Sequence, residues 1–599
     1  MKIIPKDKKG LIEAAIGRRE CDLAIENCKV VNVFSGEIYE GDVGIYGGFI
    51  AHIKCNPDNL DINEDRIKAK KYYDAKGKYI IPGLIDAHIH IESTLMTPRN
   101  FAKAVIPHGT TTVVTDPHEI ANVYGIAGVE YMHNSSEGLP MRQYVLAPSC
   151  VPAVLGLENA GAEFNYEDIE RMFELDRVIG LGEVMDYVGV IDNDTRMVKI
   201  LEAAEKRGLF IQGHAPFLSG RGLSAYLCGG AVSCHESRTA NEARDKIRNG
   251  MYVDARESSI SKDVASLVKG VEDFKYKTNL TLCTDDREAD EILEFGHMNA
   301  VVRTAIKAGM NPIDAIRSAT LNNARELGII NLGGIAPNFV ADLVLVENLE
   351  EMNVKAVIYN GEVVAEDGKL LVQIEDKEFD IENKNSVHVK DLSIEDFILK
   401  AGVESGKVKA NVIKYLAQTS SSTEIIEEEF EVENGRVKLP ENGDTKFVVV
   451  INRHGKLYTK SIALVKGFGI RKGAVGSTVS HDSHNLTIVF DNAEEGMLVA
   501  EDLIKLGGGL SCSIDGKIKN NLQLSVAGLM STRPAEEISV QAETMKKSLR
   551  EMGLTEIKNP LLRIVTLALP VIPKAKMSDL GVIDVLKKEI IEVIKYSSS

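Results

Sequence analysis

The sequence predicts an α/β protein with a central (β/α)8 TIM barrel, a β-sandwich split around that barrel, and a C-terminal α+β domain. Three observations predict this fold class. Eight short strand-like runs alternate with helix-like stretches over about 200 residues, which matches a (β/α)8 barrel in size and order. Residues of metal-ligating types follow several of these runs, and β-rich segments flank the whole block on both sides.

The β-rich flanks enclose the barrel along the chain. Residues 20–60 and 341–371 both contain short apolar runs separated by turn residues. We expect these two segments to pair as one sandwich. The expected boundaries are 1–75 and 336–378 for the two parts of the sandwich, 76–335 for the barrel, and 379–599 for the C-terminal domain.

The barrel strands are expected at eight apolar runs, with helix-like stretches such as 197–208 between most of them. An open, doubly wound sheet is the alternative. Residues of ligand type follow the first, fourth, fifth, sixth and eighth runs, and these converge easily only if the sheet closes on itself. The runs cover residues 83–88, 111–116, 144–149, 178–184, 209–214, 231–236, 251–256 and 280–285.

The pattern changes after about residue 380. We expect a helical stretch at 393–418, followed by strands at KFVVVINR and LTIVFDN. A glycine-rich turn at 507–510 then leads to the helix-like run EEISVQAETMKKSLREMG.

The composition narrows the class of protein. The chain has 88 acidic and 70 basic residues and a formal net charge of -18, which disfavours binding to nucleic acid or to an anionic membrane. Its eight cysteines form no CxxC pair, the N-terminus lacks an apolar signal segment, and no apolar stretch is long enough to span a membrane. We therefore expect a cytoplasmic enzyme.

The strand ends supply a set of candidate metal ligands. His88 and His90 are two positions apart on one strand, so both imidazoles point to the same side. His214 and His235 follow two consecutive strands, and Asp285 follows the last. A helix N-cap is the alternative role for Asp285, although Asp286 could fill it instead.

Glu183 is the residue that distinguishes one metal from two. Three histidines and Asp285 would satisfy a single metal, so an additional carboxylate at a strand end indicates a bridge between two cations. The alternative is a buried glutamate paired with an arginine.

Five motifs resemble the bacterial and archaeal adenine deaminase family of the amidohydrolase superfamily. They are DAHIHIEST (86–94), GTTTVVTDPHEIANVYG (109–125), GLGEVMDY (180–187), CTDDR (283–287) and SHDSHN (480–485). Many two-metal members of the superfamily use a carboxylated lysine as the bridge between the metals. Glu183 at the corresponding position resembles the adenine deaminase family, which uses a glutamate there. ATLNNARELG (319–328) also resembles the helix that follows the barrel in the superfamily.

The resemblance implies hydrolysis of adenine to hypoxanthine and ammonia, a step of purine salvage. His88, His90 and Asp285 would hold one metal, His214 and His235 the other, and Glu183 would bridge them. A metal-bound hydroxide would attack C6, with Asp285 moving its proton to the leaving amine. The metals would be Mn2+ or Fe2+, with Zn2+ as the alternative.

Further residues would shape the purine pocket. Glu119 with His118 would protonate a ring nitrogen, and Asp116, His481, Asp482 and His484 would bind the substrate. The alternative for the first group is a turn at Asp116 with His118 and Glu119 as surface residues. For His481, Asp482 and His484 it is a polar turn or a stray surface metal site. We expect adenine as the small-molecule partner, a homo-oligomer, and neither nucleic acid nor membrane as a partner. Another cyclic amidohydrolase, or an inactive oligomeric scaffold with the same fold, is the alternative for the whole chain.

Overall fold

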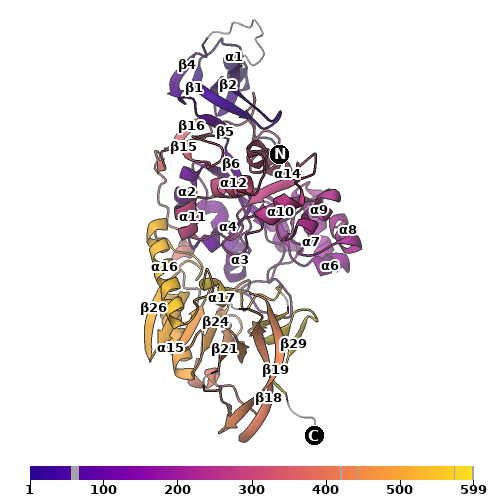
Figure 1. Cartoon of the computed structure of the whole chain (residues 1–599), viewed down its shortest axis with the longest axis vertical. Helices are drawn as coiled ribbons and strands as arrows, with labels where there is room; N and C mark the ends of the chain where they lie inside the picture. Colours follow the sequence, from indigo (N-terminus) through magenta and orange to yellow (C-terminus); the bar gives the residue numbers. More distant parts are fainter. Residues whose placement is uncertain (56–65, 418–420, 442, 573, 596–599) are drawn as a thin grey trace.

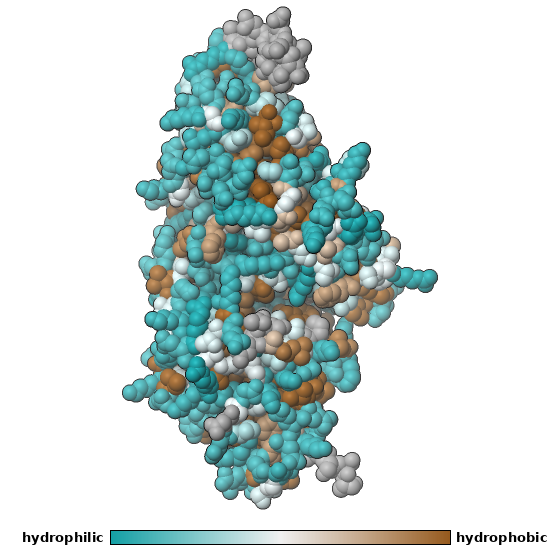
Figure 2. Space-filling view, viewed as in Figure 1, coloured by the Kyte–Doolittle hydropathy of each residue, from teal (hydrophilic) through white to brown (hydrophobic). Residues whose placement is uncertain are grey.

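The computed structural model describes residues 1–55, 66–417, 421–441, 443–572 and 574–595. The chain forms three parts along its longest axis (Figure 1). The indigo N-terminal strands lie at one end, the purple and magenta helices with their strands lie in the middle, and the orange and yellow C-terminal part lies at the other end. Hydrophilic residues cover most of the face shown in Figure 2, as the acidic composition predicts.

The two flanking β segments join in one nine-stranded sheet, which confirms their predicted pairing. The junction is β5, which pairs antiparallel with β14, placing Ile80 opposite Leu345. A bridge between Phe49 and Val340 brings the far edge strand β3 back towards this junction. The elements are α1 (Lys8–Ala15), β1 (Cys21–Asn32), β2 (Glu37–Tyr46), β3 (Phe49–Cys55), β4 (Ala69–Asp74), β5 (Tyr79–Pro82), β14 (Leu343–Val346), β15 (Val354–Tyr359), β16 (Glu362–Glu366) and β17 (Lys369–Leu370).

All eight predicted strands of the middle part are present, in two parallel sheets. The sheet orders are β10-β9-β8-β7-β6 and β11-β12-β13. Every residue of β6, β7, β9, β10 and β13 is buried, as expected for parallel strands covered on both faces. The strands are β6 (Leu84–Ile89), β7 (Thr110–Thr115), β8 (Arg142–Ala147), β9 (Val178–Val184), β10 (Phe210–Gly213), β11 (Ser233–Cys234), β12 (Tyr252–Arg256) and β13 (Leu280–Cys283).

The two parallel sheets meet at both of their outer edges. At one edge Ile89 forms a parallel bridge with Asp285, and the Asp285 amide donates to the His88 carbonyl. At the other edge the Val232 amide donates to the Ile211 carbonyl. The strand ends that carry the candidate ligands therefore face one another.

Helices alternate with these strands, including the predicted helix at 197–208, which is α7. The helices are α2 (Pro98–Val105), α3 (His118–Tyr124), α4 (Ile126–Ser135), α5 (Tyr166–Met172), α6 (Tyr187–Ile191), α7 (Thr195–Lys206), α8 (Gly220–Cys228), α9 (Ala240–Arg248), α10 (Val264–Gly270), α11 (Ala289–Phe295), α12 (Met298–Lys307), α13 (Pro312–Ser318) and α14 (Leu321–Glu326), with 3-10 turns η1 (Ile91–Thr94) and η2 (Ile106–His108). The run at 319–328 thus contains the expected helix, α14.

The C-terminal part is built on a ten-stranded sheet with helices against it. Helix α16 forms at the predicted run and packs against α11 of the middle part. The elements are η3 (Asp380–Asn383), η4 (Ile394–Phe397), β18 (Ser405–Tyr415), β19 (Thr423–Glu433), β20 (Arg436–Val437), β21 (Thr445–Ile451), β22 (Lys460–Lys466), β23 (Ala474–Ser477), β24 (Leu486–Phe490), α15 (Ala493–Leu506), β25 (Gly509–Ile514), β26 (Lys517–Gln523), α16 (Ala535–Met552), α17 (Leu561–Val565), β27 (Ala575–Ser578), β28 (Gly581–Asp584), β29 (Glu589–Ile591) and β30 (Ile594–Lys595).

The predicted helical stretch at 393–418 is wrong. Among its described residues, 393–417, only the short turn η4 is helical, and residues 405–415 form strand β18, which pairs with β19 along its whole length. The branched residues Val408, Val412 and Ile413 favour a strand, and the partner β19 supplies the hydrogen bonds that a lone helix would have made internally.

None of the helices within the described residues is both long and apolar enough to cross a membrane.

Candidate metal centre and active site

Six candidate ligands converge at the carboxyl ends of the parallel strands. His88 lies on β6 and His90 directly follows it, Glu183 lies on β9, and the remaining three follow β10, β11 and β13. Ligand atoms of His88, His90 and Glu183 lie within 4.8 Å of one another, and so do those of Glu183, His214 and His235. All six side chains are buried except that of His214, which is partly exposed. The structure therefore brings the predicted ligands into one cluster.

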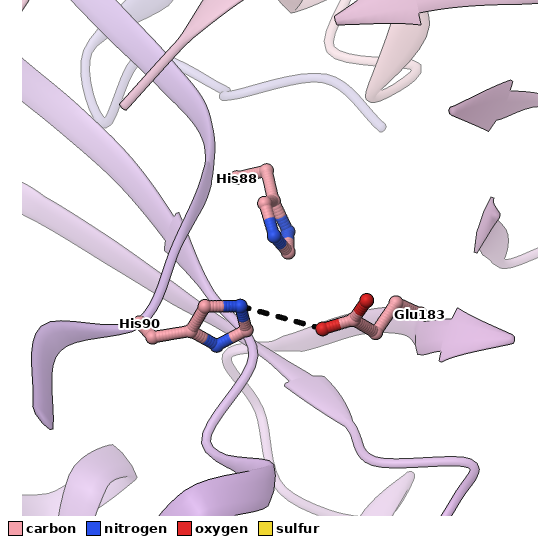
Figure 3. A group of neighbouring side chains, drawn as sticks. All are labelled: His88, His90 and Glu183. Atoms are coloured by element: carbon pink, nitrogen blue, oxygen red, sulfur yellow. Dashed lines mark ion pairs between the residues drawn. The ribbon is translucent and has the colours of Figure 1, made fainter. Parts of the chain in front are cut away.

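Glu183 lies between the two groups of histidines. Its Oε1 is 3.3 Å from His90 Nε2, the contact drawn as a dashed line in Figure 3, and the His88 ring lies beside this pair. Its Oε2 is 2.5 Å from His214 Nδ1 and 3.0 Å from His235 Nε2. Each carboxylate oxygen thus faces a different set of imidazoles, which is the geometry that a bridging ligand needs.

Asp285 faces the first group of histidines. Its Oδ1 lies 3.5 Å from His88 Nε2 and 3.4 Å from His90 Nε2. The following helix, α11, begins at Ala289, and Glu288 occupies its N-cap position. Neither Asp285 nor Asp286 therefore caps that helix, and the suggestion that Asp286 does so is wrong.

Hydrogen bonds fix which ring nitrogen of His88 and His90 is available to a metal. His88 Nδ1 lies 2.7 Å from Gln212 Oε1, and the amide of Gln212 is oriented by donating to the Ala87 carbonyl at 3.0 Å. His90 Nδ1 donates to the carbonyl of Asp116 at 2.9 Å. Because both Nδ1 atoms donate, the Nε2 lone pairs of His88 and His90 point at the carboxylates, as metal-bound histidines require.

The two carboxylates are held ionised. Burial would raise the pKa of Glu183, but the neighbouring His235 and the close contact of His214 outweigh it and hold the pKa well below its usual value. Burial also opposes ionisation of Asp285, whose pKa is nonetheless well below the usual value, chiefly because of the charge of Arg256.

The donor set fits a divalent metal. Four imidazoles and two carboxylates without a thiolate suit Mn2+, Fe2+ or Zn2+. Donor atoms placed tetrahedrally at about 2.1 Å from a metal are about 3.4 Å apart, and the contacts of His88 and His90 with the two carboxylates span 3.3–3.5 Å. His88 Nε2 is moreover buried without a hydrogen-bond partner.

Arg256 is a site residue that the sequence reasoning missed. Its guanidinium donates to Asp285 Oδ2 at 2.5 Å and also pairs with Glu236. Oδ2 is thereby occupied, which leaves Oδ1 of Asp285 facing the histidines. A signal was present, because Arg256 ends the run MYVDAR at the same strand end as the ligands.

The C-terminal part reaches this cluster through residues 480–485. His481 Nδ1 lies 3.4 Å from Glu119 Oε1, and Asp482 Oδ1 lies 3.7 Å from His118 Nε2. A cavity of about 80 Å³ lies between the two parts. It is lined by His90, His118, Glu119, Glu183, Met185, His214, His235, Glu236, Arg238, Arg256, Ile260, Asp285, Asp286, His481, Asp482, Thr566, Leu569, Val571 and Ile572. The predicted groups on Glu119, His118, His481 and Asp482 therefore share one cavity with the ligands.

His484 lies beside His481, with the two ring centroids 5.3 Å apart. Its Nδ1 accepts a hydrogen bond from the Ser480 amide at 3.1 Å, so the neutral ring carries its proton on Nε2. Nε2 is buried, has no hydrogen-bond partner, and points at Glu119 Oε2 from 3.8 Å. Because that nitrogen bears the proton, His484 is not a metal ligand in this arrangement.

Asp116 lies behind the ligands. Its Oδ2 accepts the Glu183 amide at 2.7 Å, and its carbonyl accepts from His90. A Cβ atom on Gly182 would meet Asp116 Oδ2 at 2.3 Å, so the Asp116 carboxylate occupies the space that a side chain at position 182 would need. The contacts of Asp116 support the orientation of two ligands.

Ser93 and Asp286 extend the polar cluster beyond the predicted residues. Ser93 Oγ contacts Asp286 Oδ1 at 2.5 Å and Glu119 Oε1 at 3.0 Å. Burial and the neighbouring Asp285 raise the pKa of Asp286 to about 6. Ser93 belongs to the run DAHIHIEST, but its isolated hydroxyl gave no signal of this role.

The chain matches two family models and many full-length relatives. The models are the amidohydrolase family over residues 79–364 and the adenine deaminase C-terminal domain over residues 420–589. The chain is 38% identical over 576 residues to an adenine deaminase of Clostridium acetobutylicum, covering 96% of this chain and 98% of the relative.

A second relative and one solved structure are also similar to the chain. An adenine deaminase of Methanothrix thermoacetophila is 39% identical over 575 residues, which is 96% of this chain and 97% of the relative. A beta-aspartyl dipeptidase structure from Fervidobacterium islandicum is 19% identical with a TM-score of 0.43, covering 60% of this chain and 99% of that one. The ligand cluster, the covering C-terminal part and the full-length similarity agree, and the chain belongs to the adenine deaminase family within the amidohydrolases.

Proposed function

We propose that this chain hydrolyses adenine to hypoxanthine and ammonia. The observation that carries the proposal is the shared cavity, in which most of the candidate metal ligands face acid–base groups from the start of α3 and from the 480–485 loop. The relatives named adenine deaminase span almost the whole chain, including the loop. An inactive scaffold would need none of these buried charged groups in one place.

We further propose that the eight parallel strands act as one closed (β/α)8 barrel. The bridge of Ile89 with Asp285 and the hydrogen bond of Val232 with Ile211 support closure at the two edges where the sheets meet. Closure would place all six ligands around a single opening, as in other barrel enzymes.

The ligand geometry supports two divalent metals, Mn2+ or Fe2+, with Zn2+ as the alternative. His88, His90 and Asp285 would hold one, His214 and His235 would hold the other, and Glu183 would bridge them. When bound, such a pair supplies a water that is ionised near neutral pH for attack on C6 of the purine.

The chain's own residues would orient the base and move protons. Asp285 is placed to pass a proton towards the leaving amine, because Arg256 occupies Oδ2 and leaves Oδ1 facing the reacting centre. Glu119, with His118 beside it, faces the cavity and would protonate a ring nitrogen, which makes C6 more electrophilic. His484 points its Nε2 proton at Glu119 and would hold that carboxyl in place. The covering loop also excludes bulk water.

The proposed function is tested by following ammonia release from adenine with metal-loaded protein. We expect hypoxanthine and ammonia in equal amounts. If a dihydropyrimidine or another cyclic amide is hydrolysed faster than adenine, the reaction belongs to a different amidohydrolase class. Protein that binds two metals but releases no ammonia from any of these compounds would support the scaffold alternative.

Adenine is expected to be a much better substrate than adenosine. The cavity beside the ligands is small, about 80 Å³. That volume leaves little room for a ribose in addition to the base. The measurement is kcat/KM for both compounds with the same preparation. Faster turnover of adenosine would contradict the assignment.

Replacing His484 by Ala is expected to abolish most deamination while both metals stay bound. The side chain points at Glu119 and lies 0% exposed in the covering loop, away from the metal ligands. The measurements are kcat and metal content per chain. His484→Gln keeps an N–H donor and is expected to retain part of the activity. Wild-type kcat in His484→Ala would show that the loop serves stability alone.

A further inference from the structure

Two fully buried polar side chains lie behind the ligands that follow β9, β10 and β11. Tyr226 comes from helix α8 and Lys246 from helix α9, and both are 0% exposed. Neither lines the cavity that holds the ligands. Both side chains nevertheless form hydrogen bonds with residues next to the candidate ligands.

Lys246 joins the two loops that carry His214 and His235. Its Nζ donates to the carbonyl of Ala215 at 2.7 Å, to Ser237 Oγ at 2.9 Å and to Cys234 Sγ at 3.2 Å. Ala215 directly follows His214, while Cys234 and Ser237 lie on either side of His235. An ammonium group has three protons, so all three are used on these two loops.

The charge of Lys246 does not explain its presence. Glu242 Oε1 lies 3.8 Å away, beyond hydrogen-bond distance, and a buried ammonium is costly unless it is fully hydrogen-bonded. A positive charge near a metal position also repels a cation. Lys246 therefore acts through its three directed hydrogen bonds, which hold the two loops in a fixed arrangement. An apolar side chain at this position would fill the space without linking the loops.

Tyr226 makes the corresponding link on the other side of His214. Its hydroxyl accepts from the His214 amide at 2.8 Å and donates to the carbonyl of Val184 at 2.8 Å. Val184 directly follows Glu183, so this hydroxyl connects the ends of β9 and β10. A Cβ atom on Gly213 would lie 2.2 Å from the Ser233 carbonyl, which shows how closely β10 approaches β11 here.

We propose that Lys246, together with Tyr226, is a positioning residue that sets the spacing of His214 and His235, the candidate ligands of one metal. The inference rests on the proposed two-metal function. The two side chains form a continuous link across three strand ends, from Val184 through His214 to the residues around His235. Outer groups of this kind change metal affinity about 10–100-fold when they are removed.

The test is a Mn2+ titration of metal-free protein, with free Mn2+ measured by electron paramagnetic resonance. In Lys246→Met we expect one of the two equivalents to bind about 10–100-fold more weakly and the other to stay within about threefold of wild type. The matched control is Lys446→Met, since Lys446 is also buried and donates to a backbone carbonyl, that of Arg471. It should leave both equivalents unchanged.

Two further variants keep the proposal testable if Lys246→Met does not fold. Ser237→Ala removes one acceptor of Lys246, and Tyr226→Phe removes the hydroxyl, and each should weaken the same equivalent. Equal weakening of both equivalents, or binding of both as in wild type, would overturn the proposal. Absence of deamination in wild-type protein would instead count against the proposed function, because the titration does not depend on activity.

Discussion

Asp285→Asn is expected to lower kcat by several orders of magnitude. Loss of proton transfer alone removes about 10²–10⁴-fold, and the weaker amide ligand adds to this. Asparagine keeps the size of the side chain but neither accepts a proton nor balances Arg256, whose guanidinium contacts Asp285 Oδ2 at 2.5 Å. The measurement is kcat for adenine together with metal content, so that loss of metal and loss of proton transfer are separated.

Glu288→Gln is the control for Asp285→Asn. Glu288 occupies the N-cap position of α11 without a capping hydrogen bond, so its variant tests whether disturbance of this segment alone lowers activity. We expect kcat of Glu288→Gln to stay within about tenfold of wild type. Activity of Asp285→Asn in the same range would show that Asp285 takes no part in the reaction.

Glu183→Gln is expected to lose one or both metals and, with them, nearly all activity. Glu183 offers one oxygen to His90 and the other to His214 and His235, so it is placed between both metal positions. A glutamine amide has only one oxygen and no charge, and it cannot bridge two cations. The measurement is elemental analysis of the purified variant alongside kcat.

A second buried glutamate provides the control for Glu183→Gln. Burial and the neighbouring Asp254 raise the pKa of Glu326 well above its usual value, which favours the neutral form of its carboxyl. Glu326 is not among the candidate ligands and Glu326→Gln keeps the size of the side chain, so two metals should remain. A fully active wild-type enzyme with a single metal per chain would contradict the bridging role of Glu183.

The sequence by itself determined the strands of the middle part and which residues are the candidate ligands. Parallel strands buried on both faces must be continuous apolar runs, and their carboxyl ends must meet, so residues such as His88, Glu183 and Asp285 could be assigned to one cluster from local pattern alone. The five family-like motifs predicted the family for the same reason, since each lies at or beside such a strand end or in the covering loop.

Only the tertiary structure decided which of these residues contact one another, and through which atoms. Whether residues 405–415 form a helix or a strand depended on the partner β19, which local composition does not encode. The proton on His484 Nε2 follows from the Ser480 amide, and the free oxygen of Asp285 follows from Arg256. The approach of the 480–485 loop to Glu119 depends on packing between segments more than 300 residues apart along the chain. Hydrogen bonds and charges act over a few ångströms in space, and sequence separation carries no information about that distance until the chain has folded.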